Sequence, residues 1–247
     1  MLKTGLCIVL FALAAGCAPK QKPLTDYVNP LLGTATLWDS VDLGFKPTKR
    51  TWGAEVFPGS SLPNAMVQVS PVTKFHSGAG YQYEDSVIYG FTHTNKGHWN
   101  LCHIPLLPVT GTPTPGDYCS PFSHERESAA PGYYQVFLDR YGVDAQLSST
   151  LRCAFHKYTY PAGAAPAVLA DLQRSNEHVR AWDIRKEGDN VFAGWQQTGE
   201  KMYFYAVANR PVTGIEPVVE GDREVRIVRF GEGDGALELR IGFSFVS

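Results

Sequence analysis

The stretch LELRIGFSF at residues 237–245 alternates apolar side chains with polar or small ones. Successive side chains of a β-strand point to opposite faces, so this stretch is typical of a strand with one face on a core. The same alternation recurs in AMVQVS at 65–70 and in YYQVFL at 133–138. Further short apolar stretches predict strands at 87–91, 104–109, 145–150, 154–160, 167–172, 191–197, 202–208 and 225–230.

Turn-forming residues separate most of these predicted strands. They include Asp189-Asn190, Thr198-Gly199 and the segment GEGDG at 231–235. Many short strands at such spacing predict an all-β fold, either a β-sandwich or a barrel. No segment has the periodicity of an amphipathic helix of three or more turns, and the sequence shows no internal repeat.

The composition fits a globular domain with its own core. The chain has 247 residues, enough for one large all-β domain or two small ones, with 44% hydrophobic and 19% charged residues. The formal net charge is −2, which lacks the strong positive footprint of a nucleic-acid-binding protein. We therefore expect no nucleic-acid partner, and partners that are neutral or of mixed charge.

The first residues resemble an export signal rather than part of the fold. Lys3 precedes an apolar run at 6–15, and small residues then lead to Cys17. The run is too short to cross a bilayer as a helix. We predict a lipoprotein-type signal peptide at 1–17 with Cys17 lipidated, although Leu13 lies one place further from the cysteine than in the usual pattern. The alternative is a plain secretory signal cleaved nearby.

The lipoprotein interpretation also predicts where the protein resides. Residues 18–25 would form a polar tether between the lipid anchor and the folded domain. The protein would then be exported, as a periplasmic or outer-membrane lipoprotein with the membrane as a partner through the lipid.

Three cysteines remain beyond the signal: Cys102, Cys119 and Cys153. An odd number in an exported protein allows at most one internal disulfide and leaves one thiol over. None of them forms a CxxC pair, so we expect no zinc site, and we expect buried free thiols.

The densest cluster of polar and aromatic residues follows the predicted strand at 87–91. There the chain reads GFTHTNKGHWN at 90–100, so a strand ending at Phe91 delivers a loop with His93, Asn95, His98 and Trp99. A tryptophan face offers a flat apolar platform for a sugar ring, and imidazole and amide groups can hydrogen-bond its hydroxyls. We predict these four residues after Phe91 to be substrate-binding. The alternative is that Trp99 lies in the core and the histidines are satisfied polar residues at a strand end.

Four blocks in order resemble the N-terminal domain of glycoside hydrolase family 92, the calcium-dependent exo-α-mannosidases of glycan-degrading bacteria. The blocks are YVNPLLGT at 27–34, FPGSSLPNAMVQVSP at 57–71, GAGYQYEDSVIYGFTHT at 78–94, and FSHERE at 122–127 followed by PGYY at 131–134 and by 152–161. The resemblance implies a large antiparallel β-sandwich of the supersandwich type over 26–247. It also implies a mannose-containing glycan as the partner of the loop after Phe91.

Three segments depart from the family pattern. Residues 35–54 resemble an insertion where many members have a short link rich in His and Gly. A Trp-containing loop that helps shape the leaving-group subsite in relatives reads KFHS at 74–77 here, and the usual HTHLSG segment reads TNKGHW at 94–99. These differences indicate a subgroup, and they leave its linkage specificity open.

The resemblance places the catalytic carboxylates outside this chain. In the family, the general acid and the general base lie on a following (α/α)6 helical domain, which also supplies most of the calcium environment. An inverting glycosidase needs two carboxyl groups roughly 6.5–9.5 Å apart. The acidic pairs here, Glu84-Asp85 and Glu125 with Glu127, fit solvated or salt-paired residues better, because neighbours on a strand face opposite sides. We therefore predict no catalytic residue and no calcium or other metal site for this chain alone, and we expect His124 and Glu125 to tie loops together.

Three functions are compatible with these patterns. The first is the carbohydrate-binding N-terminal domain of an α-mannosidase, which forms one wall of the active site, is inactive alone and has a helical catalytic domain as partner. The second is a stand-alone glycan-binding lipoprotein, and the third is a truncated product without function. The chain ends on an apolar strand, which we interpret as a sign that further polypeptide followed.

Overall fold

The computed structural model describes residues 22–37, 40–46, 54–97 and 99–246 of the chain. Within these ranges the protein is built almost entirely from strands, and the longest helix has four residues. The helical segments are η1 (Leu24–Tyr27), α2 (Ser40–Leu43) and η2 (His124–Arg126). None of the described helices has the length and hydrophobicity needed to cross a membrane. Cys17 and the predicted signal peptide lie outside the described residues, so lipidation stays a prediction.

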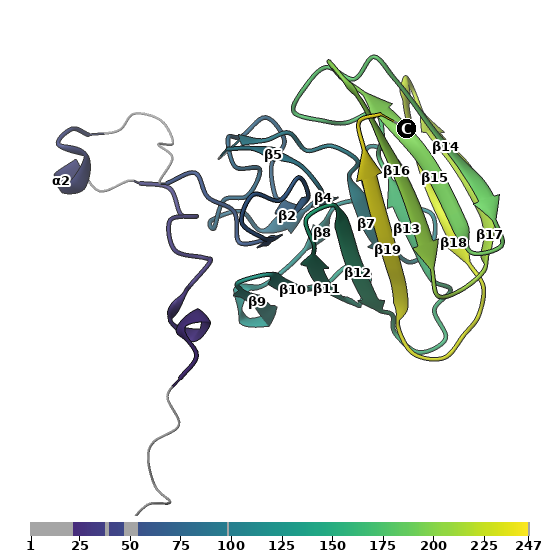
Figure 1. The fold of residues 1–247 in the computed structure, drawn as a ribbon, viewed down its shortest axis with the longest axis horizontal. Coiled ribbons are helices and arrows are strands. Elements are labelled where there is room, and N and C mark those ends of the chain that lie inside the picture. Colours follow the sequence, from purple (N-terminus) through teal and green to yellow (C-terminus); the bar gives the residue numbers. More distant parts are fainter. Residues whose placement is uncertain (1–21, 38–39, 47–53, 98, 247) are drawn as a thin grey trace, which may run out of the picture.

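Two large antiparallel sheets make up the body of the protein (Figure 1). The seven-stranded sheet has the order β1 (Ser60–Ser61), β2 (Gln68–Val72), β4 (Gly90–Thr92), β7 (Leu106–Val109), β13 (Ala167–Ala170), β18 (Arg223–Phe230) and β17 (Val212–Glu220). The eight-stranded sheet has the order β14 (Ala181–Gly188), β15 (Val191–Gln197), β16 (Lys201–Ala208), β19 (Leu237–Ser244), β12 (Cys153–Thr159), β11 (Val143–Ser149), β10 (Tyr133–Leu138) and β9 (Glu127–Ala130).

Two small pairs of strands complete the described structure. One joins β3 (Val87–Ile88) to β8 (Ser120–Pro121), and the other is a hairpin of β5 (Asn95–Lys96) and β6 (Trp99–Asn100). Both lie outside the two large sheets. The β5–β6 hairpin follows directly after β4, so it occupies the place of the polar loop singled out from the sequence.

The two large sheets face one another across a shared hydrophobic core. Strands β10 and β19 alternate buried and partly exposed residues, as expected for strands with one face on a core. The Phe91 ring of β4 reaches across the core to Tyr134 of β10 and Tyr158 of β12, with ring centroids 6.4 Å apart in both cases. This contact between sheets makes the fold an all-β sandwich, as predicted.

The predicted strands agree with most of the observed ones, with informative exceptions. The stretch at 87–91 is not one strand, because the chain leaves β3 at Tyr89, starts β4 at Gly90 (φ 153°), and the two halves join different sheets. Of the strands in the two large sheets, four were not predicted from the sequence, and all four lie at sheet edges: β1, β9, β14 and β17. Edge strands carry charges and proline that blunt further pairing, and β14 (AWDIRKEG) and β17 (VTGIEPVVE) show this composition.

All three described cysteines are free thiols. Cys102 is buried, as expected, whereas Cys119 is partly exposed and Cys153 is exposed. The expectation of buried thiols is therefore correct only for Cys102. Cys153 lies at the start of β12, where the strand pattern turns its side chain outward.

A buried pair of histidines joins the two sheets. His93, just after β4, is fully buried, and its Nε2 lies 3.1 Å from Nε2 of His156 on β12. The Tyr158 hydroxyl contacts Nδ1 of His156, and the Phe243 ring packs on His93 with centroids 4.6 Å apart. Burial lowers the pKa of His93 to about 3, against a smaller opposing effect of the His103 and Ile104 backbone. Burial and the nearby His93 also lower the pKa of His156 well below its ordinary value.

We expect this pair to make the stability of the protein depend on pH. The folded pKa values lie below the unfolded value of about 6.5, so the stabilisation is present above pH 6.5 and is lost as the pH falls toward 3. The unfolding free energy of the wild type should fall when the pH is lowered from about 6 to about 5. In His156→Gln, where a neutral amide replaces the imidazole, this fall should be smaller by about 1 kcal/mol. Urea unfolding at the two pH values measures this difference. The exposed His178→Gln serves as the control, and an equal reduction in that variant would contradict the role of the buried pair.

Candidate functional site

The core positions the polar loop because the residues before it are immobilised by burial. Phe91, Thr92 and His93 are all fully buried. The chain then forms β5 and turns at Gly97, whose φ of 63° favours glycine. It returns as β6, so that Lys96 of β5 pairs with Trp99 of β6. Trp99 emerges from this hairpin with 58% of its surface exposed. The hairpin therefore presents an aromatic ring on a rigid base.

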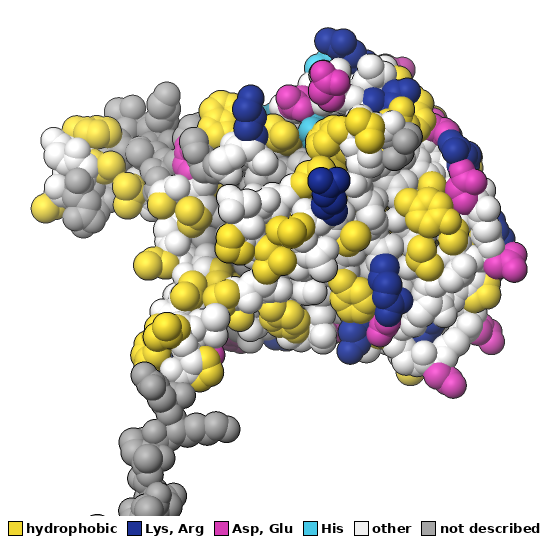
Figure 2. All heavy atoms as spheres, viewed as in Figure 1, with side chains coloured by type: hydrophobic (Ala, Val, Ile, Leu, Met, Phe, Trp, Pro, Cys, Tyr) yellow, Lys and Arg dark blue, Asp and Glu magenta, His cyan; other side chains and the backbone are white. Residues whose placement is uncertain are grey.

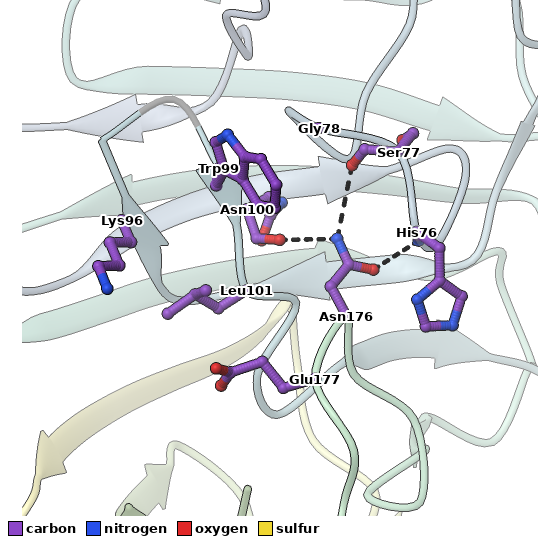
Figure 3. Close-up of a pocket in the computed structure, with 9 residues that line it drawn as sticks. All are labelled: His76, Ser77, Gly78, Lys96, Trp99, Asn100, Leu101, Asn176 and Glu177. Carbon is purple, nitrogen blue, oxygen red and sulfur yellow. Dashed lines mark hydrogen bonds between the residues drawn. The ribbon is translucent and has the colours of Figure 1, made fainter. Parts of the chain in front are cut away.

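Trp99 lines a cavity of about 570 Å³ (Figure 3). Three parts of the chain that are distant in the sequence build it: residues 76–78, Lys96 with residues 99–101, and residues 176–177. The described residues that line it are His76, Ser77, Gly78, Lys96, Trp99, Asn100, Leu101, Asn176 and Glu177. This Trp99 pocket combines an aromatic ring with amide, ammonium and carboxylate groups.

Asn176 holds the three segments together. Its side-chain oxygen accepts a hydrogen bond from the His76 backbone N–H at 2.6 Å. Its Nδ2 donates to the Asn100 carbonyl at 2.7 Å and, at 3.5 Å, to the Ser77 carbonyl (Figure 3). One side chain thus satisfies backbone groups of both other walls, which fixes the width of the pocket.

Backbone strain is concentrated beside the pocket. His76, Cys102 and Ile104 adopt positive φ angles of 57°, 54° and 52°, a region that is costly for residues other than glycine and especially for a β-branched one. The Asn100 side chain accepts from the Cys102 N–H at 2.7 Å, and Gln196 of β15 accepts from the Ile104 N–H at 2.9 Å. These hydrogen bonds keep the strained segment in one conformation under the pocket.

Glu177 supplies the carboxylate of the pocket. Its Oε2 accepts hydrogen bonds from the Thr198 hydroxyl at 2.8 Å and from Nε2 of His103 at 2.9 Å. Burial acts to raise the pKa of Glu177, but Thr198, His103 and the Lys96 ammonium outweigh it and hold this pKa below the ordinary value. Burial lowers the pKa of His103, which therefore stays neutral and accepts from the Thr94 hydroxyl at Nδ1 (2.9 Å). At neutral pH Glu177 is an ionised hydrogen-bond acceptor.

The residues predicted to bind substrate do not share one location. Trp99 lines the pocket, and substrate binding by Trp99 stays a prediction. His93 lies in the core between the sheets, with its ring against His156 and Phe243, and does not line the pocket. Asn95 is partly buried, and neither its Oδ1 nor its Nδ2 finds a hydrogen-bond partner in the described part of the chain. His98 lies outside the described residues.

Sequence reasoning missed Asn176 and Glu177 as pocket residues. They belong to the segment SNEH at 175–178, which follows the apolar strand β13. A cluster of polar residues directly after a buried strand is a signal of a functional loop. This signal could have predicted a functional loop at 175–178, but it could not have predicted that the loop lies opposite Trp99.

The FSHERE block connects loops. The sequence predicted this role for both His124 and Glu125, and the structure gives it to His124 alone of the two. Nδ1 of His124 contacts the fully buried Glu127 carboxylate at 2.6 Å, and Nε2 contacts the Tyr83 carbonyl at 2.7 Å. Burial raises the pKa of both Tyr81 and Tyr134, so each hydroxyl keeps its proton and donates to Glu127. Glu125 is exposed and is joined to Ser123 only through its backbone N–H; Glu127 is the carboxylate that connects the loops.

The described residues contain no cluster of the side chains that most often hold a metal ion. No three or more His, Cys, Asp or Glu side chains of the described ranges come together in a way that could hold a metal ion. Of the residues that line the Trp99 pocket, only Glu177 is a carboxylate, and His103 and Thr198 already occupy its Oε2. No step involving calcium is therefore derived for this chain.

The sandwich has counterparts among known proteins. The profile of the Glycosyl hydrolase family 92 N-terminal domain matches residues 27–244. The chain therefore belongs to this family and is a mannosidase-related domain. A search of curated proteins finds no significant match.

Solved structures with the same fold include α-mannosidases of family 92. The α-mannosidase BT3965 from Bacteroides thetaiotaomicron is 24% identical, with a TM-score of 0.78, over 93% of this chain and 34% of that one. Its complex with mannoimidazole gives a TM-score of 0.76 at 24% identity, over 92% and 33%. The inverting mannosidase BT2199 from the same bacterium gives 0.72 at 22% identity, over 92% and 32%. The chain thus spans about a third of these relatives, and at such identities the likeness shows the fold alone.

We expect Asn176→Ala to loosen the pocket. The substitution removes the acceptor for His76 and the donor for Asn100, so unfolding free energy should fall by about 1–3 kcal/mol. Amide hydrogen exchange at 76–78 and 99–101 should become faster. Asn176→Asp keeps the acceptor and loses the donor, so it should fall between wild type and Asn176→Ala. If amide hydrogen exchange in both segments is unchanged in Asn176→Ala, Asn176 does not hold the walls of the pocket together.

Proposed function

We propose that this chain is the carbohydrate-binding N-terminal domain of an α-mannosidase and that the Trp99 pocket forms one wall of the mannose site. Membership of the family supports the mannosidase relationship. The observation that carries the proposal is the Trp99 ring, which is 58% exposed at the edge of a cavity that also contains Lys96, Glu177 and Asn100. The ligand would be a mannose-containing glycan.

The pocket has the two kinds of group that a pyranose ring requires. The Trp99 face can cover the CH face of the ring and remove apolar surface from water. Lys96 can donate to hydroxyl oxygens, and the ionised Glu177 can accept from hydroxyl hydrogens. A cavity of about 570 Å³ is of the size of small-molecule sites.

The same groups argue against hydrolysis by these residues alone. An inverting glycosidase needs a carboxylic acid with a raised pKa and a second carboxylate roughly 6.5–9.5 Å away. Glu177 is the one carboxylate among the described lining residues, and its pKa is lowered. We therefore propose that the catalytic carboxylates belong to polypeptide outside this chain, in line with relatives about three times as long. Glu177 would orient the sugar.

The relatives indicate which sugar the Trp99 pocket would bind. BT3965 is an α-mannosidase that has been solved with mannoimidazole, and BT2199 is an inverting mannosidase. A related site would select a terminal α-mannosyl unit, and the departures at 74–77 and 94–99 would alter what the pocket accepts beyond that unit. His76 and Ser77 line the cavity, so this loop is where the difference would act.

We expect Trp99→Ala to weaken binding of methyl α-mannoside at least tenfold, because truncation removes the aromatic platform. Isothermal titration calorimetry of the full chain measures this change. Trp99→Phe retains part of the platform and should retain part of the affinity. Tyr27→Ala, at an exposed aromatic residue that does not line this pocket, is the matched control.

Two outcomes would contradict the proposal. Unchanged mannoside affinity in Trp99→Ala would exclude the pocket as the sugar site. Release of mannose from a mannoside by the chain alone, with calcium present, would contradict the placement of the catalytic carboxylates outside it.

A further inference from the structure

A second hollow, of about 650 Å³, lies on the outer face of the eight-stranded sheet. It spans β14, β15, β16 and β19 and shares no lining residue with the Trp99 pocket. Figure 2 shows hydrophobic side chains gathered over β15 and β16 on the face in view, with charged side chains at the margin. The lining includes Trp195, Lys201, Tyr203, Tyr205, Gly242 and Ser244. We call this feature the sheet-face hollow.

Strand register creates the hollow. Tyr205 of β16 pairs with Ala193 on one side and with Gly242 on the other. Directly paired residues point to the same face of a sheet, so the Tyr205 ring stands between two of the smallest side chains. Its surface is 53% exposed. A Cβ added at Gly242 would meet nothing within 4 Å, which shows that the space beside the ring is open.

Two residues along the strand from Tyr205, a cross-strand pair of aromatic residues lies on the same face. Tyr203 pairs with Trp195 of β15 and with Ser244 of β19. The Lys201 ammonium lies 4.0 Å from the Trp195 ring centroid and 5.8 Å from that of Tyr203. Trp195, Tyr203 and Tyr205 therefore form a contiguous aromatic surface with a cation at one end.

The opposite margin of the hollow carries charges of both signs. Arg185 of β14 pairs with Glu187 at 2.7 Å and with Asp183 at 3.2 Å. Arg185 and Glu187 both line the hollow, together with Lys201 and the Ser244 hydroxyl. Such groups can donate to and accept from hydroxyls in several directions.

We propose that the sheet-face hollow is a second carbohydrate-binding site, for a hexopyranose unit of a glycan chain. A sugar ring has an apolar CH face and a hydroxyl edge, which match the aromatic floor and the charged margin. A hollow of about 650 Å³ is of the size of a small-molecule site. Arg185, Glu187 and Lys201 can hydrogen-bond the hydroxyls of a sugar at its margin. Two separate sites on one chain would hold a polymeric glycan more tightly than either site alone.

The test uses the full chain carrying Trp99→Ala, so that the first pocket does not contribute. Soluble α-mannan and a soluble β-linked glucan are the probes, and affinity electrophoresis with each polysaccharide in the gel measures binding. We expect retardation by at least one of them. Adding Gly242→Val, which fills the open space beside Tyr205 with a residue suited to strands, should weaken binding about tenfold. Tyr205→Ser should have a similar effect.

Val207→Thr is the matched control, because Val207 lies on the same outward face of β16 but does not line the hollow. Equal melting temperatures would establish that all variants are folded. The proposal is overturned if Trp99→Ala alone abolishes retardation, since all binding would then belong to the first pocket. Equal retardation with and without Gly242→Val would also overturn it. Failure of both polysaccharides to retard even the wild-type chain would overturn it as well and would favour a protein partner on this face.

Discussion

The burial of β4 and of the residue that follows it is the constraint on which the Trp99 pocket depends. Phe91 contacts Tyr134 and Tyr158 of the opposite sheet, and His93 contacts His156 there. Because these side chains are locked between the sheets, the β5–β6 hairpin starts from a fixed position. Asn176 and the hydrogen bonds at Cys102 and Ile104 then fix its far side. The Trp99 ring can be exposed to water and still keep a fixed position, because the core holds the strand that precedes its hairpin.

Electrostatics distinguish the Trp99 pocket from an acid–base centre. The pocket holds one ionised carboxylate, stabilised by Thr198, His103 and Lys96. A general acid requires the opposite environment, one that raises the pKa. A wall of this kind can bind and orient a sugar while leaving proton transfer to carboxylates supplied from elsewhere. The neutral histidines, His93, His103 and His156, contribute to structure rather than to acid–base chemistry.

Much of the fold could be predicted from the sequence because the period of two is a local signal. β10 and β15 have the predicted bounds, and β19 differs by one residue. The edge strands β14 and β17 could not be found this way, because charged residues and Pro217 occupy their exposed positions. In the site, Trp99 was found from its residue type. Asn176 was not, because its place opposite Asn100 depends on a contact across 76 positions of the chain. His93 shares strand parity with Phe91, and that parity was a usable sign that it faces the core.

The most direct measurement of the central claim is a crystal structure of the chain with methyl α-mannoside. The account predicts a pyranose ring stacked on Trp99, with hydroxyls within hydrogen-bond distance of Glu177 and Lys96. An ordered sugar bound elsewhere while the Trp99 pocket holds only water would contradict it.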